Sequence, residues 1–224
     1  MVNMNDCSVI DSRMLNFVRT TISESDSHAT ELERRFTFRN RFHHCVRVAL
    51  LAMEIAESEG ANADVASISG LFHDSGKAEG RDHAVVSAEI CRNYLVENQL
   101  LAPEIDRIGD CVRNHSSKTA FDDSAYPDDL AILRDADILD EVGAMGITWT
   151  LLGTGILEPR SYNEALARLI ELHIANAPTD LLNKIRTATA RSLMRERIDR
   201  EQSFIRELSA ELKIDRFEPE KGAI

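Results

Sequence analysis

The sequence has 224 residues, of which 43% are hydrophobic, and it carries a formal net charge of −12. This length allows one large domain or two small ones with a sizeable core, and the acidic balance argues against a broad surface for nucleic-acid polymers or anionic membranes. A small phosphate compound stays compatible with this charge, because a metal ion or a local lysine can reverse the sign inside a pocket.

Helical periodicity extends over nearly the whole chain, and strand-like alternation is not sustained anywhere. In the first half, helices are expected over residues 8–22, 26–38, 42–59, from Asn62 or Asp64 to His73–Asp74, 83–98 and 103–115. Gly60 is expected to end the third helix and Asp82 to cap the fifth, while Pro103 occupies a first-turn position.

The second half continues this pattern after the polar loop SSKTAFDDSAYPDD. The expected elements are a helix from Pro127 to Val142, a short apolar helix within GAMGITWTLLGTG, a helix over 161–176 that Pro178 ends, and an amphipathic stretch over 179–213 with room for one break. We therefore predict a single all-α domain over residues 1–224, with additional helices at both ends of a central bundle.

The cysteines and the apolar runs indicate a compartment. The four cysteines are scattered without a CxxC pair, so we expect buried free thiols. No apolar run approaches the roughly 18 residues of a membrane span, and the first residues lack the apolar run of a signal peptide. We predict a protein of the reduced cytoplasm that does not bind membranes.

Helical spacing distinguishes four of the seven histidines, because they lie at or near helix ends on stripes that face the core: His44, His73, His83 and His115. A single histidine on such a stripe is usually a hydrogen-bonded core residue, and we interpret His173 in that way, as core or interface packing. Several histidines beside carboxylates are harder to explain as packing, since burying them without partners costs kilocalories each. A bound divalent ion would satisfy them together, and Mn²⁺, Fe²⁺, Co²⁺, Zn²⁺ and Ni²⁺ suit these ligands.

Three segments carry distinctive spacings: H-x-x-R-V in RFHHCVRVALLAMEIAESEG, H-D-x-G-K in ISGLFHDSGK, and D-A-D-x-L-D-x-x-G-A-x-G-I in DADILDEVGAMGI. They resemble motifs of the HD superfamily of metal-dependent phosphohydrolases, and the last is similar to that of its small stand-alone bacterial members. ATARSLMRERIDREQSFIRELSAEL resembles their C-terminal helix. The resemblance covers residues 38 to 212 and implies an HD-domain helical bundle, with an HD core at about 38–150 and C-terminal helices at 161–213.

The resemblance implies a metal site made of His44, His73, Asp74 and Asp137. It alone selects Asp137, because helical spacing makes Asp135 an equally good inward residue; Asp135 and Asp140 are expected to support the ligands or to lie in solvent. The ion would be one divalent Mn, Fe, Ni, Co, Zn or Mg, with room for a second. In that case Asp74 would bridge the two ions.

Further residues receive roles from the same resemblance. Asp74 could also orient the attacking water, and His83 and His115 match in order the histidines that follow the HD pair in two-metal members. These two histidines would bind a second ion, contact phosphate or donate a proton to the leaving oxygen. Lys77 and Arg47 would bind substrate phosphate. The alternatives are a surface lysine compensating a helix C-terminus for Lys77, and support of a ligand carboxylate or a surface ion pair with glutamates for Arg47.

The implied function is metal-dependent hydrolysis of a phosphoester or phosphoanhydride in a small substrate. We expect a nucleoside tri- or diphosphate first, and a nucleoside monophosphate or a cyclic dinucleotide second. The sequence has no G-Y-P segment, which argues against the HD-GYP phosphodiesterases. The alternatives are an HD-fold oxygenase with mixed-valent iron and a non-catalytic HD module that binds a nucleotide. Apolar faces on the helices of 161–213 also allow a homodimer.

Overall fold

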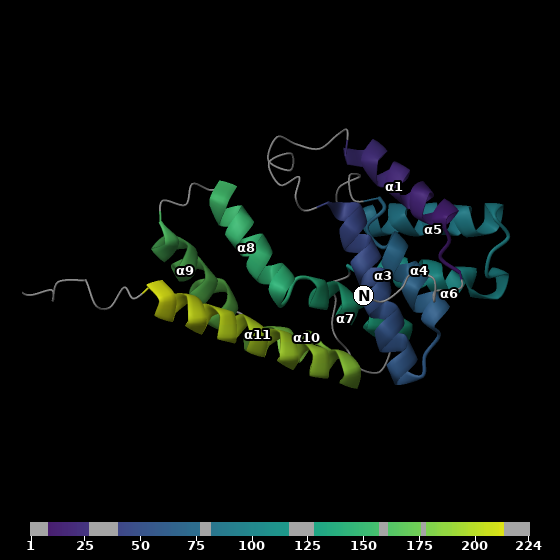
Figure 1. Ribbon diagram of the computed structural model, residues 1–224. Coiled ribbons are helices and arrows are strands. Elements are labelled where there is room, and N and C mark those ends of the chain that lie inside the picture. Colours follow the sequence, from purple (N-terminus) through teal and green to yellow (C-terminus); the bar gives the residue numbers. More distant parts are fainter. Residues whose placement is uncertain are drawn as a thin grey trace, which may run out of the picture. The chain divides into compact units, whose positions relative to one another are not determined.

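The computed structural model describes residues 9–26, 40–76, 82–116, 128–156, 161–175 and 178–212. All regular elements in these ranges are helical, so the predicted all-α class is confirmed (Figure 1). The chain divides into two compact units, an N-terminal unit of Met1–Asp140 with Ile185–Arg191 and a C-terminal unit of Glu141–Lys184 with Ser192–Ile224. Whether the two units form the single domain predicted over residues 1–224 depends on how they are joined, so the single domain stays a prediction.

The N-terminal unit is a bundle built around α3 and α4. Its elements are α1 (Ser12–Asp26), α3 (Arg41–Glu59), α4 (Ala63–Phe72), α5 (His83–Glu97), a 3₁₀ turn (Ala102–Glu104), α6 (Ile105–Asn114) and α7 (Asp128–Asp140). Helix α3 packs against α4 and α7, and α5 packs against α6. The core is mainly aliphatic, with Phe72, Ile68 and Leu95 fully buried. The polar helix expected over 26–38 lies almost wholly outside the described residues.

Several helix ends follow from capping residues. Gly60 ends α3 in the left-handed conformation at φ 73°, as predicted. Asn62 opens α4, since its side chain accepts hydrogen bonds from two backbone N–H groups of the first turn. Asp82 occupies the N-cap position of α5, as predicted, but its side chain makes no capping hydrogen bond. Helix α1 begins four residues later than predicted, because the Asp11 carboxylate accepts from the Met14 N–H.

Two glycines allow the chain around the end of α4 to lie close to its neighbours. A Cβ atom on Gly70 would lie 2.8 Å from the Ala49 Cα atom on α3. A Cβ atom on Gly76 would lie 2.8 Å from the Ser87 backbone nitrogen on α5, and the Gly76 N–H donates to the Ser87 hydroxyl. The residues between these glycines, His73 and Asp74 among them, are therefore held against both α3 and α5.

The C-terminal unit has its own small apolar core. It contains α8 (Ala144–Ile156), α9 (Tyr162–Ile170) with a π-helical turn (Glu171–Ala175), α10 (Pro178–Lys184) and most of α11 (Ala188–Leu212). Its core side chains are Ile147, Leu166, Leu169 and Ile205. Pro178 begins α10, where proline's fixed φ suits a first helical position. The amphipathic stretch over 179–213 is broken once, between α10 and α11.

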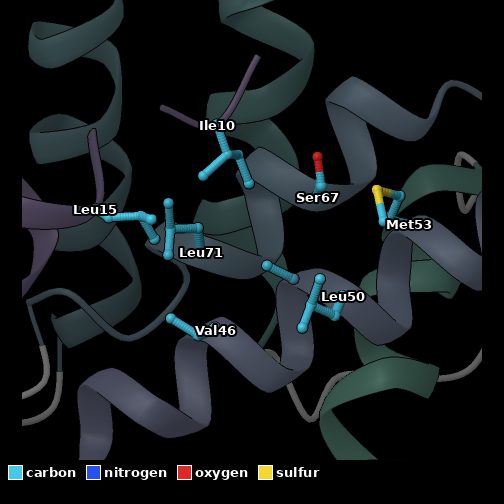
Figure 2. Close-up of a pocket in the computed structure, with 8 residues that line it drawn as sticks. Ile10, Leu15, Val46, Leu50, Met53, Ser67 and Leu71 are labelled. Atoms are coloured by element: carbon cyan, nitrogen blue, oxygen red, sulfur yellow. The ribbon is translucent and has the colours of Figure 1, made fainter. Parts of the chain in front are cut away.

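An apolar pocket in the N-terminal unit is lined by residues of α3 and α4, by Leu15 of α1 and by Ile10 just before α1. Figure 2 shows Leu15, Leu50 and Leu71 facing it. Its remaining lining residues are Ile10, Val46, Ala49, Met53 and Ser67, so it contains no imidazole or carboxylate. In the part of the chain that the structure describes, no helix combines the length and the apolar character that a membrane span requires.

Candidate metal centre

The four histidines selected from the sequence lie together in the N-terminal unit. His44 is in the first turn of α3, His73 directly follows α4, His83 begins α5 and His115 directly follows α6. Their rings form a row in which neighbouring centroids lie 5.0 to 5.2 Å apart, in the order His44, His73, His115 and His83. Four separate helix ends therefore bring one imidazole each to the same place.

The first group in this row contains all four ligands implied by the resemblance. His44 Nε2 lies 3.2 Å from His73 Nε2 and 3.2 Å from Asp137 Oδ1. His73 Nε2 lies 3.6 Å from the same Asp137 oxygen and 4.0 Å from Asp74 Oδ2. One atom each of His44, His73 and Asp74 lie within 4.8 Å of one another, as metal ligands would.

A second group shares Asp74 with the first. Asp74 Oδ1 lies 3.5 Å from His83 Nε2 and 3.5 Å from His115 Nε2, and the three residues again place their ligand atoms within 4.8 Å of one another. The two oxygens of Asp74 therefore face different groups, with Oδ2 toward His73 and Oδ1 toward His83 and His115. Either group could hold an ion, and Asp74 belongs to both groups.

Hydrogen bonds fix the rings of three histidines. His73 Nδ1 lies 2.7 Å from the Gly70 carbonyl and His115 Nδ1 lies 2.7 Å from the Val112 carbonyl. A carbonyl only accepts, so both Nδ1 atoms donate and, in the neutral rings, both Nε2 atoms carry lone pairs. His44 Nδ1 lies 2.8 Å from Asp140 Oδ2, which gives its neutral ring the same form. In the neutral rings, the Nε2 atoms that face the centre are therefore acceptors.

These acceptors require a cation among them. The lone pairs of His44 Nε2 and His73 Nε2 face each other and the Asp137 carboxylate, an arrangement that would be repulsive without a positive charge. In the metal-free chain, protons supply that charge. Burial lowers the pKa of His44, but its contacts with Asp137 and Asp140 outweigh burial and raise the pKa to about 9.

The pKa values of His73 and Asp137 are shifted in the directions that favour charged groups around a cation. Burial lowers the pKa of His73, but the charge of Asp74 and contacts with Asp137 raise it well above its usual value. Burial raises the pKa of Asp137, but its contacts with His44 and His73 hold the pKa well below the usual range. His44 and His73 thus favour their protonated forms and Asp137 its ionised form, as expected of groups around a cation site.

The donor atoms fit a transition-metal ion. Two ligand nitrogens at about 2.1 Å from one ion, with angles between octahedral and tetrahedral, lie about 3.0 to 3.4 Å apart, and the two Nε2 atoms of His44 and His73 are 3.2 Å apart. Imidazole with carboxylate suits Zn²⁺, Mn²⁺, Fe²⁺, Co²⁺ and Ni²⁺. The residues therefore fit a divalent ion of this kind, with Asp137, whose side chain is 37% exposed, at the solvent side.

Arg47 forms an ion pair beside this centre. Its Nε donates to Asp140 Oδ1 over 2.7 Å and its Nη2 donates to Asp140 Oδ2 over 2.8 Å. Sequence reasoning left Asp140 either supporting a ligand or in solvent, and it lies buried against His44. A spacing signal was present, because His44 and Arg47 on α3, and Asp137 and Asp140 on α7, are each three residues apart and share a helix face.

Asp135 lies apart from the proposed ligands although it is on the same helix as Asp137. Asp135 turns away from the histidines, and its carboxylate accepts from the backbone N–H groups of Arg186 and Thr187 just before α11. Asp137, two residues further along α7, reaches His44 instead. Helical spacing could not separate these two aspartates. Lys77 lies outside the described residues.

Comparison with known proteins gives one family. Residues 41–142 match the model of the HD domain family. This range includes every candidate ligand of both groups and both residues of the Arg47–Asp140 pair.

Curated relatives match over shorter segments. Ribonuclease Y of Helicobacter pylori is 34% identical over 100 residues, which covers 35% of this chain and 19% of that protein. Ribonuclease Y of Thermotoga petrophila is 42% identical over 59 residues, which covers 25% of this chain and 12% of that protein. The chain therefore spans about a fifth or less of the length of these relatives.

Solved structures match over most of the chain. A predicted HD superfamily hydrolase from an uncultured Thermotogales bacterium is 24% identical, with 89% of this chain and 91% of that chain covered and a TM-score of 0.58. Bacillus subtilis YpgQ in complex with ADP is also 24% identical, with 89% and 95% covered and a TM-score of 0.59. An HD-superfamily hydrolase from Bacillus thuringiensis is 19% identical, with 89% and 98% covered and a TM-score of 0.60. These likenesses show a shared fold.

Proposed function

This chain carries an HD domain over residues 41–142, and from that premise we propose that it is a metal-dependent phosphohydrolase that cleaves a phosphoester or phosphoanhydride in a small nucleotide. The observation that carries the proposal is the pair of ligand groups that share Asp74. Its two oxygens face opposite groups of imidazoles whose Nε2 atoms converge, and such an arrangement suits ions more than packing.

The first group would hold the principal ion through His44, His73, Asp74 and Asp137. When bound, such an ion supplies a water of lowered pKa as nucleophile and polarises a phosphoryl oxygen. Asp74 has a second oxygen directed away from His73 and would orient the attacking water through it. The partly exposed Asp137 lies at the solvent side of the group, where substrate would enter.

The second group supports either of two roles. His115 Nε2 and His83 Nε2 both face Asp74 Oδ1. They would hold a second ion together with Asp74, or they would contact the phosphate and donate a proton to the leaving oxygen. Lys77, the residue after Gly76, would pair with a phosphate oxygen through its ammonium group.

A nucleoside di- or triphosphate is the proposed substrate class. The fold neighbour YpgQ was solved in complex with ADP, which supports a nucleotide as ligand of this fold. The relatives named Ribonuclease Y suggest an RNA phosphodiester as the second candidate. The formal net charge of −12 disfavours a long polyanion, so the small nucleotide is preferred.

The test combines metal content with a substrate panel. The purified protein, loaded in turn with Mn²⁺, Ni²⁺, Co²⁺, Zn²⁺ and Mg²⁺, is assayed on nucleoside mono-, di- and triphosphates, cyclic dinucleotides and a short single-stranded RNA, with phosphate and pyrophosphate detected separately. We expect hydrolysis of a nucleotide that Asp74→Asn abolishes. The matched control is Asp129→Asn, since Asp129 is also a buried carboxylate of this unit but pairs with Arg107.

Each outcome of this test has one meaning. Absence of bound metal, or full activity in Asp74→Asn, contradicts the proposal. If the protein cleaves only RNA, the substrate class becomes an RNA phosphodiester and not a small nucleotide. Colour and stoichiometric iron in aerobically purified protein, without phosphate release, would favour the oxygenase, and nucleotide binding without turnover would favour the non-catalytic module. The homodimer and the cytoplasmic location stay predictions, the first of which sedimentation analysis would test.

A further inference from the structure

We infer that Asp140, oriented by Arg47, is a positioning residue that fixes the ring of His44 and, in the neutral ring, directs the lone pair of Nε2 toward the proposed ion. The inference rests on the proposed metal site, and it assigns a role to two residues outside the implied ligand set. Asp140 does not face the centre, so it would act through His44.

The contacts of Asp140 leave its carboxylate little freedom. Asp140 is only 5% exposed, and its Oδ2 atom lies 2.8 Å from both His44 Nδ1 and Arg47 Nη2. Its Oδ1 atom accepts from Arg47 Nε over 2.7 Å. A two-point contact of guanidinium with carboxylate fixes the plane of the carboxylate as well as its distance. Arg47 thus holds Asp140 in the orientation from which it accepts from His44.

The position of His44 in its helix explains why it needs a partner from elsewhere. The last four carbonyls of an α-helix have no partner within the helix, and Gly70 and Val112 are each the third residue from the end of α4 and α6. His73 and His115 follow those ends and bend back onto these carbonyls. Each therefore fixes its own Nδ1–H within its own helix.

His44 cannot use the same device. It lies in the first turn of α3, where the free backbone groups are N–H donors instead of carbonyls. Its Nδ1–H must find an acceptor on another element, and Asp140 on α7 supplies it over 2.8 Å. Of these three rings, His44 is the one held by a charged side chain.

Two consequences follow for metal binding. Acceptance by Asp140 keeps the proton on Nδ1 and the lone pair on Nε2, which lies 3.2 Å from His73 Nε2. The carboxylate charge also makes the imidazole a stronger ligand, and loss of such supporting partners typically costs about 10- to 100-fold in metal affinity. Arg47 contributes by orientation, so a lysine in its place would give a smaller loss, since an ammonium cannot form the two-point contact.

The experiment compares Asp140→Asn and Arg47→Lys with Asp135→Asn. Asp135 is the matched control because it is a buried carboxylate on the same helix that accepts from Arg186 and Thr187. Zn²⁺ affinity is measured by competition with a chromophoric chelator, and folding by circular dichroism. We expect about 10- to 100-fold weaker binding in Asp140→Asn, an intermediate loss in Arg47→Lys, and an unchanged affinity with lower stability in Asp135→Asn.

A second readout needs no metal. Side-chain ¹⁵N spectra of the histidines in the metal-free protein, recorded at a pH at which the imidazole rings are neutral, report which ring nitrogen carries the proton. We expect the proton on Nδ1 of His44 in the unaltered chain, and a shift toward Nε2 in Asp140→Asn. Protonation at Nε2 in the unaltered chain would overturn the inference.

The two proposals fail in different ways. If the unaltered chain binds no Zn²⁺, the proposed function fails, and the ¹⁵N spectra still decide the role of Asp140. If the unaltered chain binds Zn²⁺ and both variants bind it within about twofold of that affinity, the role of Asp140 fails alone. Should Asp140→Asn not fold, Arg47→Lys keeps the test decisive, because Arg47 is 36% exposed and tolerates substitution more readily.

Discussion

The two units each contain a buried cluster of histidine and carboxylate, and the clusters differ in how they use the imidazole nitrogens. In the C-terminal unit, His173 Nδ1 lies 3.1 Å from Glu201 Oε1, and His173 Nε2 lies 2.8 Å from the Thr150 hydroxyl. Glu201 also accepts from the Gly143 N–H just before α8. Both ring nitrogens thus have partners within the protein, in a linear chain of contacts that connects α8, the π-helical turn and α11.

In the N-terminal cluster, three of the four histidines use one ring nitrogen for a contact within the protein and direct the other toward the centre. Nδ1 of His44, His73 and His115 faces an acceptor, while the Nε2 atoms face one another and the carboxylates of Asp74 and Asp137. A histidine that serves packing satisfies both nitrogens, and a histidine that serves an ion keeps one lone pair for it. This difference, more than burial or the count of histidines, distinguishes the candidate metal centre from the polar core of the C-terminal unit.

The largest effect should come from replacing one histidine by glutamine in each cluster. His73→Gln removes an Nε2 atom that is a proposed metal ligand. We expect metal affinity to fall by more than about 100-fold, which exceeds the loss typical of residues that only support a ligand. His173→Gln should leave metal stoichiometry unchanged and lower the free energy of unfolding by about 1 to 3 kcal/mol, because buried partners lose their hydrogen bonds. Metal analysis and urea unfolding measure the two quantities. A folded His173→Gln that binds less metal would contradict the separation of the clusters.

A smaller effect is expected from adding one methyl group in each unit. In Gly70→Ala the new Cβ would lie 2.8 Å from Ala49 Cα and 2.9 Å from its nitrogen, which are backbone atoms that cannot turn aside. Helices α3 and α4 must separate at a cost of about 1 to 3 kcal/mol, and His44 must move relative to His73. We expect weaker metal binding together with lower stability.

The corresponding change in the C-terminal unit is Gly146→Ala. Its Cβ would lie 2.5 Å from the Glu141 carbonyl oxygen and 3.2 Å from His173 Cε1. We expect a comparable loss of stability by thermal unfolding, with metal affinity unchanged. Equal metal affinity in Gly70→Ala and the unaltered chain would show that the spacing of α3 and α4 does not control the site.

Local signals predicted much of the fold. Helix ends were predicted correctly where the capping chemistry lies within a few residues, as at Gly60 and Asn62. The start of α1 was missed although Asp11 is a standard capping residue, because the apolar stripe continues upstream of it. Pro178 was interpreted as a helix end and begins α10, since proline after one helix and at the start of the next gives the same pattern.

The site was less accessible to sequence reasoning. The family resemblance alone proposed Asp137, because Asp135 and Asp137 point about 160° apart on a helix and both stripes contain apolar neighbours. Their partners decide between them, and those partners are distant in sequence: Asp135 contacts Thr187, and Asp137 contacts His44. The role of Asp140 depends likewise on a contact 96 residues away. Packing of separate helices creates these contacts, and no local pattern reports it.

The last expected effect is a pH dependence of stability that belongs to the N-terminal cluster. Relative to its usual pKa of 6.5, the pKa of His44 is raised to about 9 by Asp137 and Asp140, which outweigh burial. The folded metal-free chain therefore binds more protons than the unfolded chain between these values, and its stability falls as pH rises. The stabilisation is fully present below about pH 6.5 and is lost as pH rises through about 9.

Metal should reverse the sign of this dependence. Ligand imidazoles must lose their protons to bind an ion, so the stability gained on adding Zn²⁺ should rise with pH over the interval in which the metal-free chain loses stability. Urea unfolding with chelator and with Zn²⁺, at several pH values from about 6.5 to about 9, measures both slopes. In His44→Gln, the unfolding free energy of the metal-free chain should depend less steeply on pH, because the variant lacks the His44 imidazole that binds one of these protons. If the stability of the metal-free chain stays constant or rises over this interval, protons do not hold the converging Nε2 atoms together. The difference from the His173 cluster, in which both ring nitrogens have partners within the protein, would then need another cause.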